Sequence, residues 1–369
     1  MLQLSTMTIN YTYITVAFLC SLLFSLIGTP LIVKICNKHK IYDQPDTRKL
    51  HKEEIPRLGG TLFMPSMGFG VTIALFMMYG RQKEIEVGIS SFVMCVGAIL
   101  IYLIGILDDL KNLKATHKFI IQTIAALGFP LCNLMISDLH GLFGIHELPL
   151  WISYLLTVFV ILLIVNAINL IDGIDGLASG FSIIILGSFV YFYYNINSIL
   201  FCLISISLTG ALTAFFIYNF FGKVGKNKIF MGDSGSLFLG YVIAYLAIKY
   251  QMPNSARGFI VGEEALLIPF TLVFLPCIDV IRVALQRKLQ GRKMFEADKT
   301  HIHHLIMKTG LDMHQALATI IVLFALLVMI NYGLQVIETQ ITFIVLADIA
   351  IYSLFMWAIN ACGVSQQSR

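Results

Sequence analysis

Runs of about 20 apolar residues recur along the sequence, and each is long enough to cross a bilayer as a helix. Only 12% of the residues are charged and the mean hydropathy is +0.84, whereas a soluble domain carries about 25% charged residues. Because a helix satisfies its own backbone hydrogen bonds in lipid, we predict an all-α polytopic integral membrane protein, with residues 1–369 forming a single membrane-embedded domain. About eleven spans are expected, at 11–35, 58–80, 87–107, 118–137, 150–170, 177–195, 197–218, 235–250, 264–285, 314–336 and 340–361.

Lysine and arginine are distributed unevenly among the segments that join these spans. With the N-terminus outside, 21 of the 25 basic residues fall on the cytoplasmic side, as the positive-inside rule requires. We therefore predict an outer N-terminus and a cytoplasmic C-terminus. The net charge of +4 reflects this topology and does not indicate nucleic-acid binding. The seven cysteines show no paired spacing, so neither a disulfide framework nor a zinc site is expected.

The fifth span ends in a run of regularly spaced amides and carboxylates. Asn166, Asn169, Asp172 and Asp175 follow one another at intervals of three residues, and residues three apart are neighbours on one ridge of a helix. A glycine after each carboxylate weakens the helix and lets the backbone approach a ligand. Unpaired carboxylates at the end of a membrane helix are costly. A metal or phosphate site is the favoured interpretation, and a helix cap with a solvated turn is the alternative.

Two adjacent carboxylates, Asp108 and Asp109, end the third span. They repel each other and oppose the dipole at a helix C-terminus, where a structural role would more readily use Lys. A divalent cation, or a catalytic proton held by the pair, would explain the placement. Lys118 follows at the start of the next span, where it can meet an anion.

Asp233 lies among small residues in the segment Phe230-Met-Gly-Asp-Ser-Gly-Ser236. Small neighbours allow the backbone to lie against a ligand while the carboxylate faces a metal. The lysines just upstream suit phosphate binding. The alternative is a structural one, in which Asp233 is the N-cap of the next helix.

Two basic loops carry further candidates. His301, His303 and His304 lie in a loop rich in Arg and Lys, and although three close histidines suggest a metal site, we favour hydrogen bonding to a pyrophosphate or a sugar. The first loop, 37–60, either serves orientation alone or gathers an anion. In the second case its Gly59-Gly60 pair would start a helix whose free N–H groups favour phosphate.

Taken together, these motifs resemble the polyprenyl-phosphate N-acetylhexosamine-1-phosphate transferases of glycosyltransferase family 4. The resemblance rests on Asp108-Asp109, Asn166–Asp175, Phe230–Ser236 and His301–His304 in matching order, over roughly residues 30 to 320. The His-Ile-His-His form, together with the segment Arg48–Gly60, is more similar to the undecaprenyl-phosphate GlcNAc-1-phosphate transferases. The muramoyl-pentapeptide type typically has three adjacent histidines instead.

The resemblance implies a phosphotransferase that moves N-acetylglucosamine 1-phosphate from UDP-GlcNAc to undecaprenyl phosphate. It would release UMP, start lipid-linked cell-envelope polysaccharide synthesis and depend on Mg²⁺, or on Mn²⁺ in its place. The implied partners are a UDP-sugar donor, a polyprenyl phosphate acceptor and the membrane, without nucleic acid, and the family allows a homodimer. The implied location is the bacterial inner membrane, with a multi-pass chain. Its active site would be cytoplasmic and formed by loops 37–60, 108–118, 166–180, 219–236 and 286–312.

The resemblance also assigns roles residue by residue. Asp108 matches the group that deprotonates or orients the lipid phosphate, and Asp172 and Asp175 lie where the family contacts metal and uridine. The segment 222–227 departs from the family's Asn-Pro-Ala-like segment, so no uracil contact is assigned there. The expected residues are Asp108, Asp109 and Asp172 for catalysis, Asn169 and Asp233 for the metal, and Lys49, Lys118, Asn166, Asp175, His301, His303 and His304 for substrate.

Other functions are weighed against this one. A phospho-MurNAc-pentapeptide transferase, or a transferase for another UDP-N-acetylhexosamine, would use the same motifs. A secondary transporter would carry its ionisable residues near mid-span with internal repeats, whereas these carboxylates cluster at span ends. Two mechanisms also stay open, direct attack by the lipid phosphate and a covalent intermediate on an Asp. We favour direct attack because the lipid phosphate already carries an anionic oxygen.

Overall fold

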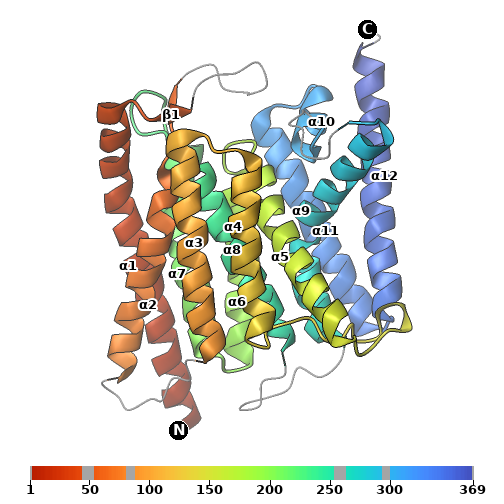
Figure 1. Cartoon of the computed structure of the whole chain (residues 1–369), viewed down its shortest axis with the longest axis horizontal. Helices are drawn as coiled ribbons and strands as arrows, with labels where there is room; N and C mark the ends of the chain where they lie inside the picture. Colours follow the sequence, from red (N-terminus) through yellow and green to blue (C-terminus); the bar gives the residue numbers. More distant parts are fainter. Residues whose placement is uncertain (1, 44–53, 80–87, 253–262, 293–299, 368–369) are drawn as a thin grey trace.

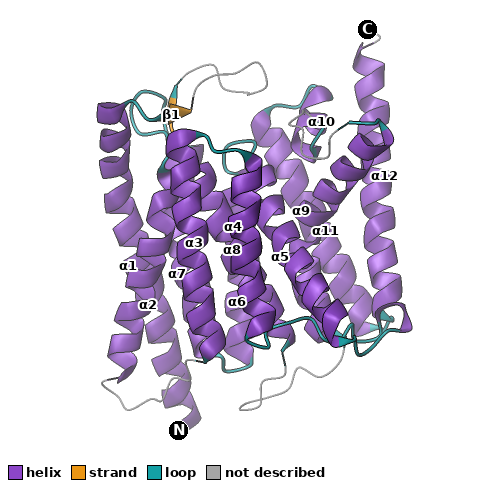
Figure 2. Ribbon diagram, viewed as in Figure 1, coloured by secondary structure: helices purple, strands orange, loops and turns teal. Residues whose placement is uncertain are grey.

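The computed structural model describes residues 2–43, 54–79, 88–252, 263–292 and 300–367 of the 369-residue chain. Its helices run side by side, and the two termini lie at opposite ends of the bundle (Figure 1). In the described part of the chain, the only sheet is one short pair of strands (Figure 2). The all-α polytopic fold class predicted from the sequence is therefore confirmed.

Helices occupy every segment that was expected to span the membrane. By length and composition, nine helices in the described residues could cross a bilayer. α4 and α8 are not among them, and α4 has only 17 residues because it ends just after Pro130. The exact number of spans and the orientation stay predictions. The elements are α1 Leu2–His39, β1 Tyr42–Asp43, β2 Ile55–Pro56, η1 Gly59–Leu62, α2 Phe63–Tyr79, α3 Ile89–Lys111, α4 Ala115–Leu131, η2 Leu142–Gly144, α5 Leu150–Ile171, α6 Leu177–Asn195, α7 Ile199–Phe220, α8 Gly232–Gln251, α9 Glu264–Leu289, α10 Ile302–Lys308, α11 Met313–Val336 and α12 Ile341–Gln367.

The helix α8 lies at the centre of this arrangement. It packs against α2, α3, α5, α6 and α9, and nearly all of its residues are buried. Because protein rather than lipid surrounds it, α8 can use Ser, Gly and Tyr where a lipid-facing helix needs aliphatic side chains. Its first turn carries Asp233.

Two glycines let the neighbouring helices approach α8 closely. A Cβ on Gly105 of α3 would lie 2.5 Å from the Cα of Ser234, and a Cβ on Gly240 of α8 would lie 2.7 Å from the Cα of Val165 on α5. Small residues at helix crossings allow such backbone contact in membrane proteins. These two crossings bring the ends of α3 and α5 to the first turn of α8, so their polar residues meet at one place.

The first loop is joined to the start of α8 by backbone hydrogen bonds. The N–H of Phe230 donates to Pro56 O at 2.7 Å, while the N–H groups of Gly59 and Gly60 donate to Phe230 O and Met231 O at 2.9 and 2.8 Å. The hypothesis that the Gly59-Gly60 pair offers free N–H groups to phosphate is therefore wrong. The glycines serve close packing instead, because a Cβ on Gly60 would overlap the Cα of Gly235.

We expect Gly60→Ala to destabilise the protein, because the added methyl has backbone rather than a movable side chain in its way. Overpacking of this kind costs about 1–3 kcal/mol, which should lower the thermal unfolding midpoint of the detergent-solubilised protein by several degrees. The matched control is Gly68→Ala on the exposed side of α2, where a Cβ meets no atom within 4 Å. Equal midpoints for the two variants would contradict the close packing of η1 on α8.

Candidate active site

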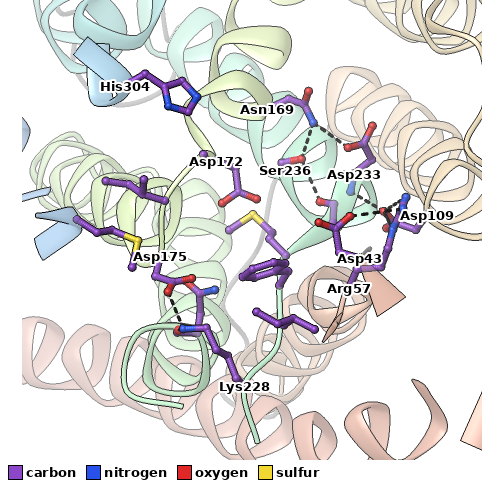
Figure 3. Close-up of a pocket in the computed structure, with 18 of the residues that line it drawn as sticks. Asp43, Arg57, Asp109, Asn169, Asp172, Asp175, Lys228, Asp233, Ser236 and His304 are labelled. Atoms are coloured by element: carbon purple, nitrogen blue, oxygen red, sulfur yellow. Dashed lines mark hydrogen bonds and ion pairs between the residues drawn. The ribbon is translucent and has the colours of Figure 1, made fainter. Parts of the chain in front are cut away.

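A pocket with a volume of about 590 Å³ opens at the end of the bundle where β1 and α10 lie (Figures 1 and 3). It draws residues from all five loops that the sequence analysis singled out. The lining residues are Asp43, Ile55, Arg57, Asp109, Asn169, Asp172, Gly173, Ile174, Asp175, Asn219, Lys228, Phe230, Met231, Gly232, Asp233, Ser236, His304, Met307 and Met313. Carboxylates and basic groups therefore share one cavity with apolar side chains.

The side chain of Asp233 contacts two other helices, α4 and α5. Its Oδ2 accepts a hydrogen bond from Lys118 Nζ of α4 at 2.5 Å, and its Oδ1 accepts one from Asn169 Nδ2 of α5 at 3.2 Å. The same amide nitrogen of Asn169 also donates to Ser236 Oγ at 2.8 Å. The two residues expected as metal ligands, Asn169 and Asp233, are thus adjacent, and both line the pocket (Figure 3).

Asp109 uses both carboxylate oxygens to hold the start of α8. Oδ1 accepts from the backbone N–H of Asp233 at 2.8 Å, and Oδ2 accepts from the N–H of Ser234 at 3.0 Å. Arg57 of the first loop adds an ion pair to Oδ1 at 3.2 Å. A carboxylate at a helix N-terminus satisfies free N–H groups and the helix dipole. This geometry gives Asp109 a positioning role beside the catalytic one that was expected.

Asp108 lies beside the pocket rather than in its lining. Its Oδ1 accepts from Leu113 N at 2.7 Å, and its Oδ2 pairs with Lys118 Nζ at 3.2 Å. Lys118 therefore bridges Asp108 and Asp233, and it reaches the cavity through the second of these carboxylates. The sequence pair Asp108-Asp109 thus points its two side chains at different partners.

Asp172 and Asp175 lie in the same turn but differ in their surroundings: Asp175 is paired with a basic side chain, whereas Asp172 has carboxylates as neighbours. Asp175 is paired with Lys228 Nζ at 2.5 Å. Asp172 follows the last residue of α5, and Figure 3 shows its carboxylate pointing into the cavity. Burial, followed by the negative charges of Asp233 and Asp175, raises the pKa of Asp172 to about 7.

The remaining expected residues separate into those in the cavity and those behind it. Asn166 turns away from the pocket and donates to Gln122 Oε1 at 2.9 Å and to Leu162 O at 2.7 Å. Among the histidines, His304 lines the cavity, whereas His301 is buried against Asp279 with a 2.8 Å contact. Lys49 lies outside the described residues.

His303 packs behind the cavity wall. Its ring lies against Gly173, where a Cβ would collide with it, and its exposed fraction is 2%. Burial, then the neighbouring rings of His304 and His301, lowers the pKa of His303 to about 3, so the imidazole is neutral near pH 7. Because the buried ring of His303 carries no charge, the three histidines can pack side by side without repulsion from this ring.

The structure adds Arg57 and Asn219, which the sequence analysis did not single out, and selects Lys228 from the lysines upstream of Asp233. Arg57 and Lys228 supply basic groups to the cavity, and Asn219 fixes the turn after Asp175 by accepting from Gly176 N at 2.7 Å. Arg57 and Lys228 each lie close in sequence to a motif residue, so basic loop residues beside a carboxylate motif were the available signal. Asn219, at the end of α7, carried no such signal.

The oxygen-rich side of the cavity fits a hard divalent cation that is held partly by the protein and partly by the phosphates of its substrate. Mg²⁺ prefers oxygen ligands and commonly binds through one or two carboxylates, with water and substrate phosphates completing its shell. Asp233, Asp172 and the amide of Asn169 offer such a set. Among the residues that the structure describes, no group of three or more His, Cys, Asp or Glu side chains could hold a metal by itself. A substrate that brings its own oxygens suits this arrangement.

Comparisons with known proteins agree with one another. The model for glycosyl transferase family 4 matches residues 91–251. The chain is 34% identical, over 81% of its length and 78% of the relative's, to a Bacillus subtilis (strain 168) protein described as a probable undecaprenyl-phosphate N-acetylglucosaminyl 1-phosphate transferase. It is also 29% identical to a Yersinia pestis protein and 28% identical to an Escherichia coli (strain K12) protein, over 93% and 81% of its length and 87% and 77% of theirs. Both are described as undecaprenyl-phosphate alpha-N-acetylglucosaminyl 1-phosphate transferases.

We expect Asp172→Asn to stabilise the cation-free protein more at pH 8 than at pH 5. A carboxyl group with its pKa raised to about 7 keeps a proton that the unfolded chain releases near pH 4, so its cost to stability grows between these values and is constant above them. Asn cannot ionise and avoids this cost. The measurement is the thermal unfolding midpoint of the variant minus that of the wild type at each pH. The same difference at both would show that Asp172 ionises near its ordinary range.

Proposed function

Because the chain belongs to glycosyl transferase family 4, we propose that it transfers N-acetylglucosamine 1-phosphate from UDP-GlcNAc to undecaprenyl phosphate. The observation that carries this proposal is one cavity lined by carboxylates, an amide and basic groups from five loops at one end of a membrane bundle. An anionic, water-soluble donor and a membrane-bound acceptor can meet at such a place. A multi-pass membrane protein with an apolar exterior suits the lipid acceptor.

The reaction joins an oxygen of the lipid phosphate to the phosphorus that bears the sugar. The bond from that phosphorus to the bridging oxygen breaks, and UMP leaves with the bond's electron pair. Attack of one anion on another requires positive charge around the reacting phosphates, and positioning supplies most of the remaining rate. The lipid phosphate oxygen is already anionic, so this step needs no strong base.

Basic side chains lie on both sides of the cavity. Lys228 lines the cavity, where it is held against Asp175 (Figure 3), and Lys118 is held against the other side of Asp233, just behind the lining. Each lysine is paired with a carboxylate, which keeps its position fixed before substrate arrives. Fixed charges of this kind stabilise a pyrophosphate without reorganising during the reaction. We therefore assign Lys118 and Lys228 to the two ends of the donor's phosphate chain.

Mg²⁺, for which Mn²⁺ is a reasonable substitute, is the cation that we propose for this site. Asp233 and Asn169 would hold it, with Asp172 at hand in the same cavity. When bound, it supplies neutralisation of the pyrophosphate and of the departing UMP oxygen. Asp109 is occupied with the first turn of α8 and Asp108 with Leu113 and Lys118, so neither is free to act as a nucleophile without breaking these contacts. This argues against a covalent intermediate on Asp108 or Asp109, and the anionic oxygen of the lipid phosphate supports direct attack.

The orientation of the site follows from the basic residues. The loops that contribute to the cavity carry most of the Lys and Arg of the chain, so we assign them to the cytoplasm, where UDP-sugars are found. Because the relatives are bacterial, we propose the bacterial inner (plasma) membrane as the location.

We expect Asp233→Asn to lower kcat by at least about 10²-fold, the scale reached when one electrostatic catalytic group is removed. The variant loses the charge that pairs with Lys118, while its size and shape are kept. UMP release with undecaprenyl phosphate and UDP-GlcNAc is the readout. The matched control is Asp138→Asn, in the segment between α4 and η2 that pairs with Glu147 and lies outside this cavity. Near-normal turnover of Asp233→Asn would mean that Asp233 only caps α8.

The donor is expected to be UDP-GlcNAc rather than UDP-MurNAc-pentapeptide. A donor with a peptide needs room and polar contacts beyond the sugar, and the sequence has no long polar insertion to supply them. A site built to hydrogen-bond the acetamido group strongly penalises a sugar that lacks it. Competition between UDP-GlcNAc, UDP-GalNAc, UDP-glucose and the pentapeptide donor with purified protein, scored by UMP release, tests this. Faster transfer from the pentapeptide donor would overturn the donor assignment and leave the phosphotransferase proposal standing.

A further inference from the structure

The short helix α10 begins directly after His301 and carries His304 to the cavity. A helix of 7 residues has too few internal hydrogen bonds to hold its own position. We propose that Asp279 and Arg282 of α9 and Tyr352 of α12, here named the α10 clamp, position His304 and the Asp172 turn for donor binding. This inference rests on the proposed transferase function.

Asp279 fixes the first residues of α10. Its Oδ2 lies 2.8 Å from His301 Nδ1, and its two oxygens lie 3.2 and 3.3 Å from the backbone N of Ile302. A carboxylate only accepts hydrogen bonds, so Nδ1 of His301 carries the proton. Asp279 and His301 are both buried, with exposed fractions of 5% and 6%. His301 thus lies behind the cavity and is a positioning residue.

Tyr352 brings the last helix into the same network. Its hydroxyl donates to Asp279 Oδ1 at 2.9 Å and accepts from Arg282 Nε at 3.0 Å, which uses both capacities of a phenol. Arg282 Nη2 donates to Asp279 Oδ1 and to Thr300 O, each at 2.6 Å. The clamp therefore holds the backbone of Thr300 and of Ile302, the residues on either side of His301.

Contacts between the histidine rings connect the clamp to His304 in the cavity. The ring of His301 is parallel to that of His303, with centroids 6.2 Å apart and an interplanar angle of 5°, and His303 meets His304 at 4.3 Å. His303 also fills the space beside Gly173, next to Asp172. A shift of His301 would displace His303, and through it both His304 and the turn that holds Asp172.

The first test removes one hydroxyl from the clamp. We expect Tyr352→Phe to raise the KM for UDP-GlcNAc by about three- to tenfold, the range that corresponds to one buried hydrogen bond, with kcat changed by less than roughly twofold. Amide hydrogen exchange of residues 300–308 should become faster. The matched control is Tyr193→Phe, which removes another buried hydroxyl, bonded to Leu246 O, at the far end of α6 from the cavity. This control should change neither KM nor exchange in 300–308.

The second test separates positioning by His301 from direct contact with substrate. Asn at position 301 keeps an N–H donor for Asp279, whereas Leu keeps only bulk. We expect His301→Asn to stay near the wild-type KM and His301→Leu to raise the KM at least as much as Tyr352→Phe. Equal losses for His301→Asn and His301→Leu would overturn the hydrogen bond to Asp279 as the contact that positions His301.

The outcomes distinguish the clamp from the transferase proposal. Unchanged KM and unchanged exchange in Tyr352→Phe would overturn the clamp, as would an equal KM rise in Tyr193→Phe. Faster exchange of 300–308 in Tyr352→Phe, with no UMP released by the wild type, would support the clamp and overturn the proposed function.

Discussion

The buried carboxylate of Asp109 is the contact on which the rest of the site depends. It joins the end of α3, the first loop through Arg57 and the backbone at the start of α8. A buried carboxylate is stable only when its oxygens are hydrogen-bonded and its charge is paired, and Asp109 meets both conditions with groups from two other segments. Because one of the N–H donors belongs to Asp233, the same contact sets where Asp233 stands in the cavity.

Repulsion between the carboxylates of the cavity explains where the basic side chains around it lie. The cavity gathers Asp172, Asp175 and Asp233, and such carboxylates tolerate one another only with basic partners or a cation. Lys118 and Lys228 are those partners in the described structure. The lysines that neutralise these carboxylates are also the groups that we propose for the phosphates of a nucleotide sugar. Stability and recognition then use the same groups.

The sequence predicted the carboxylates and the helices well, for a physical reason. Polar residues at the ends of apolar runs are conspicuous, so Asp108-Asp109, Asn169, Asp172 and Asp233 could be found by inspection. The partners of these residues could not. Asp109 holds α8 because α3 and α8, which are distant in sequence, cross closely at Gly105, and Tyr352 reaches Asp279 from a helix about 70 residues further on. The phosphate site predicted at Gly59-Gly60 was wrong for the same kind of reason. The backbone carbonyls that accept hydrogen bonds from these two N–H groups lie about 170 residues further on and could not be found from the sequence.

The central claim is that phosphate moves together with the sugar. It is tested most directly with purified protein, Mg²⁺, undecaprenyl phosphate and UDP-GlcNAc that carries ³²P in the phosphate next to the sugar. Attack at that phosphorus predicts that the label enters the lipid fraction in step with the release of UMP. Label that stays in UDP while the sugar enters the lipid would identify a transfer at the sugar carbon and would contradict the account.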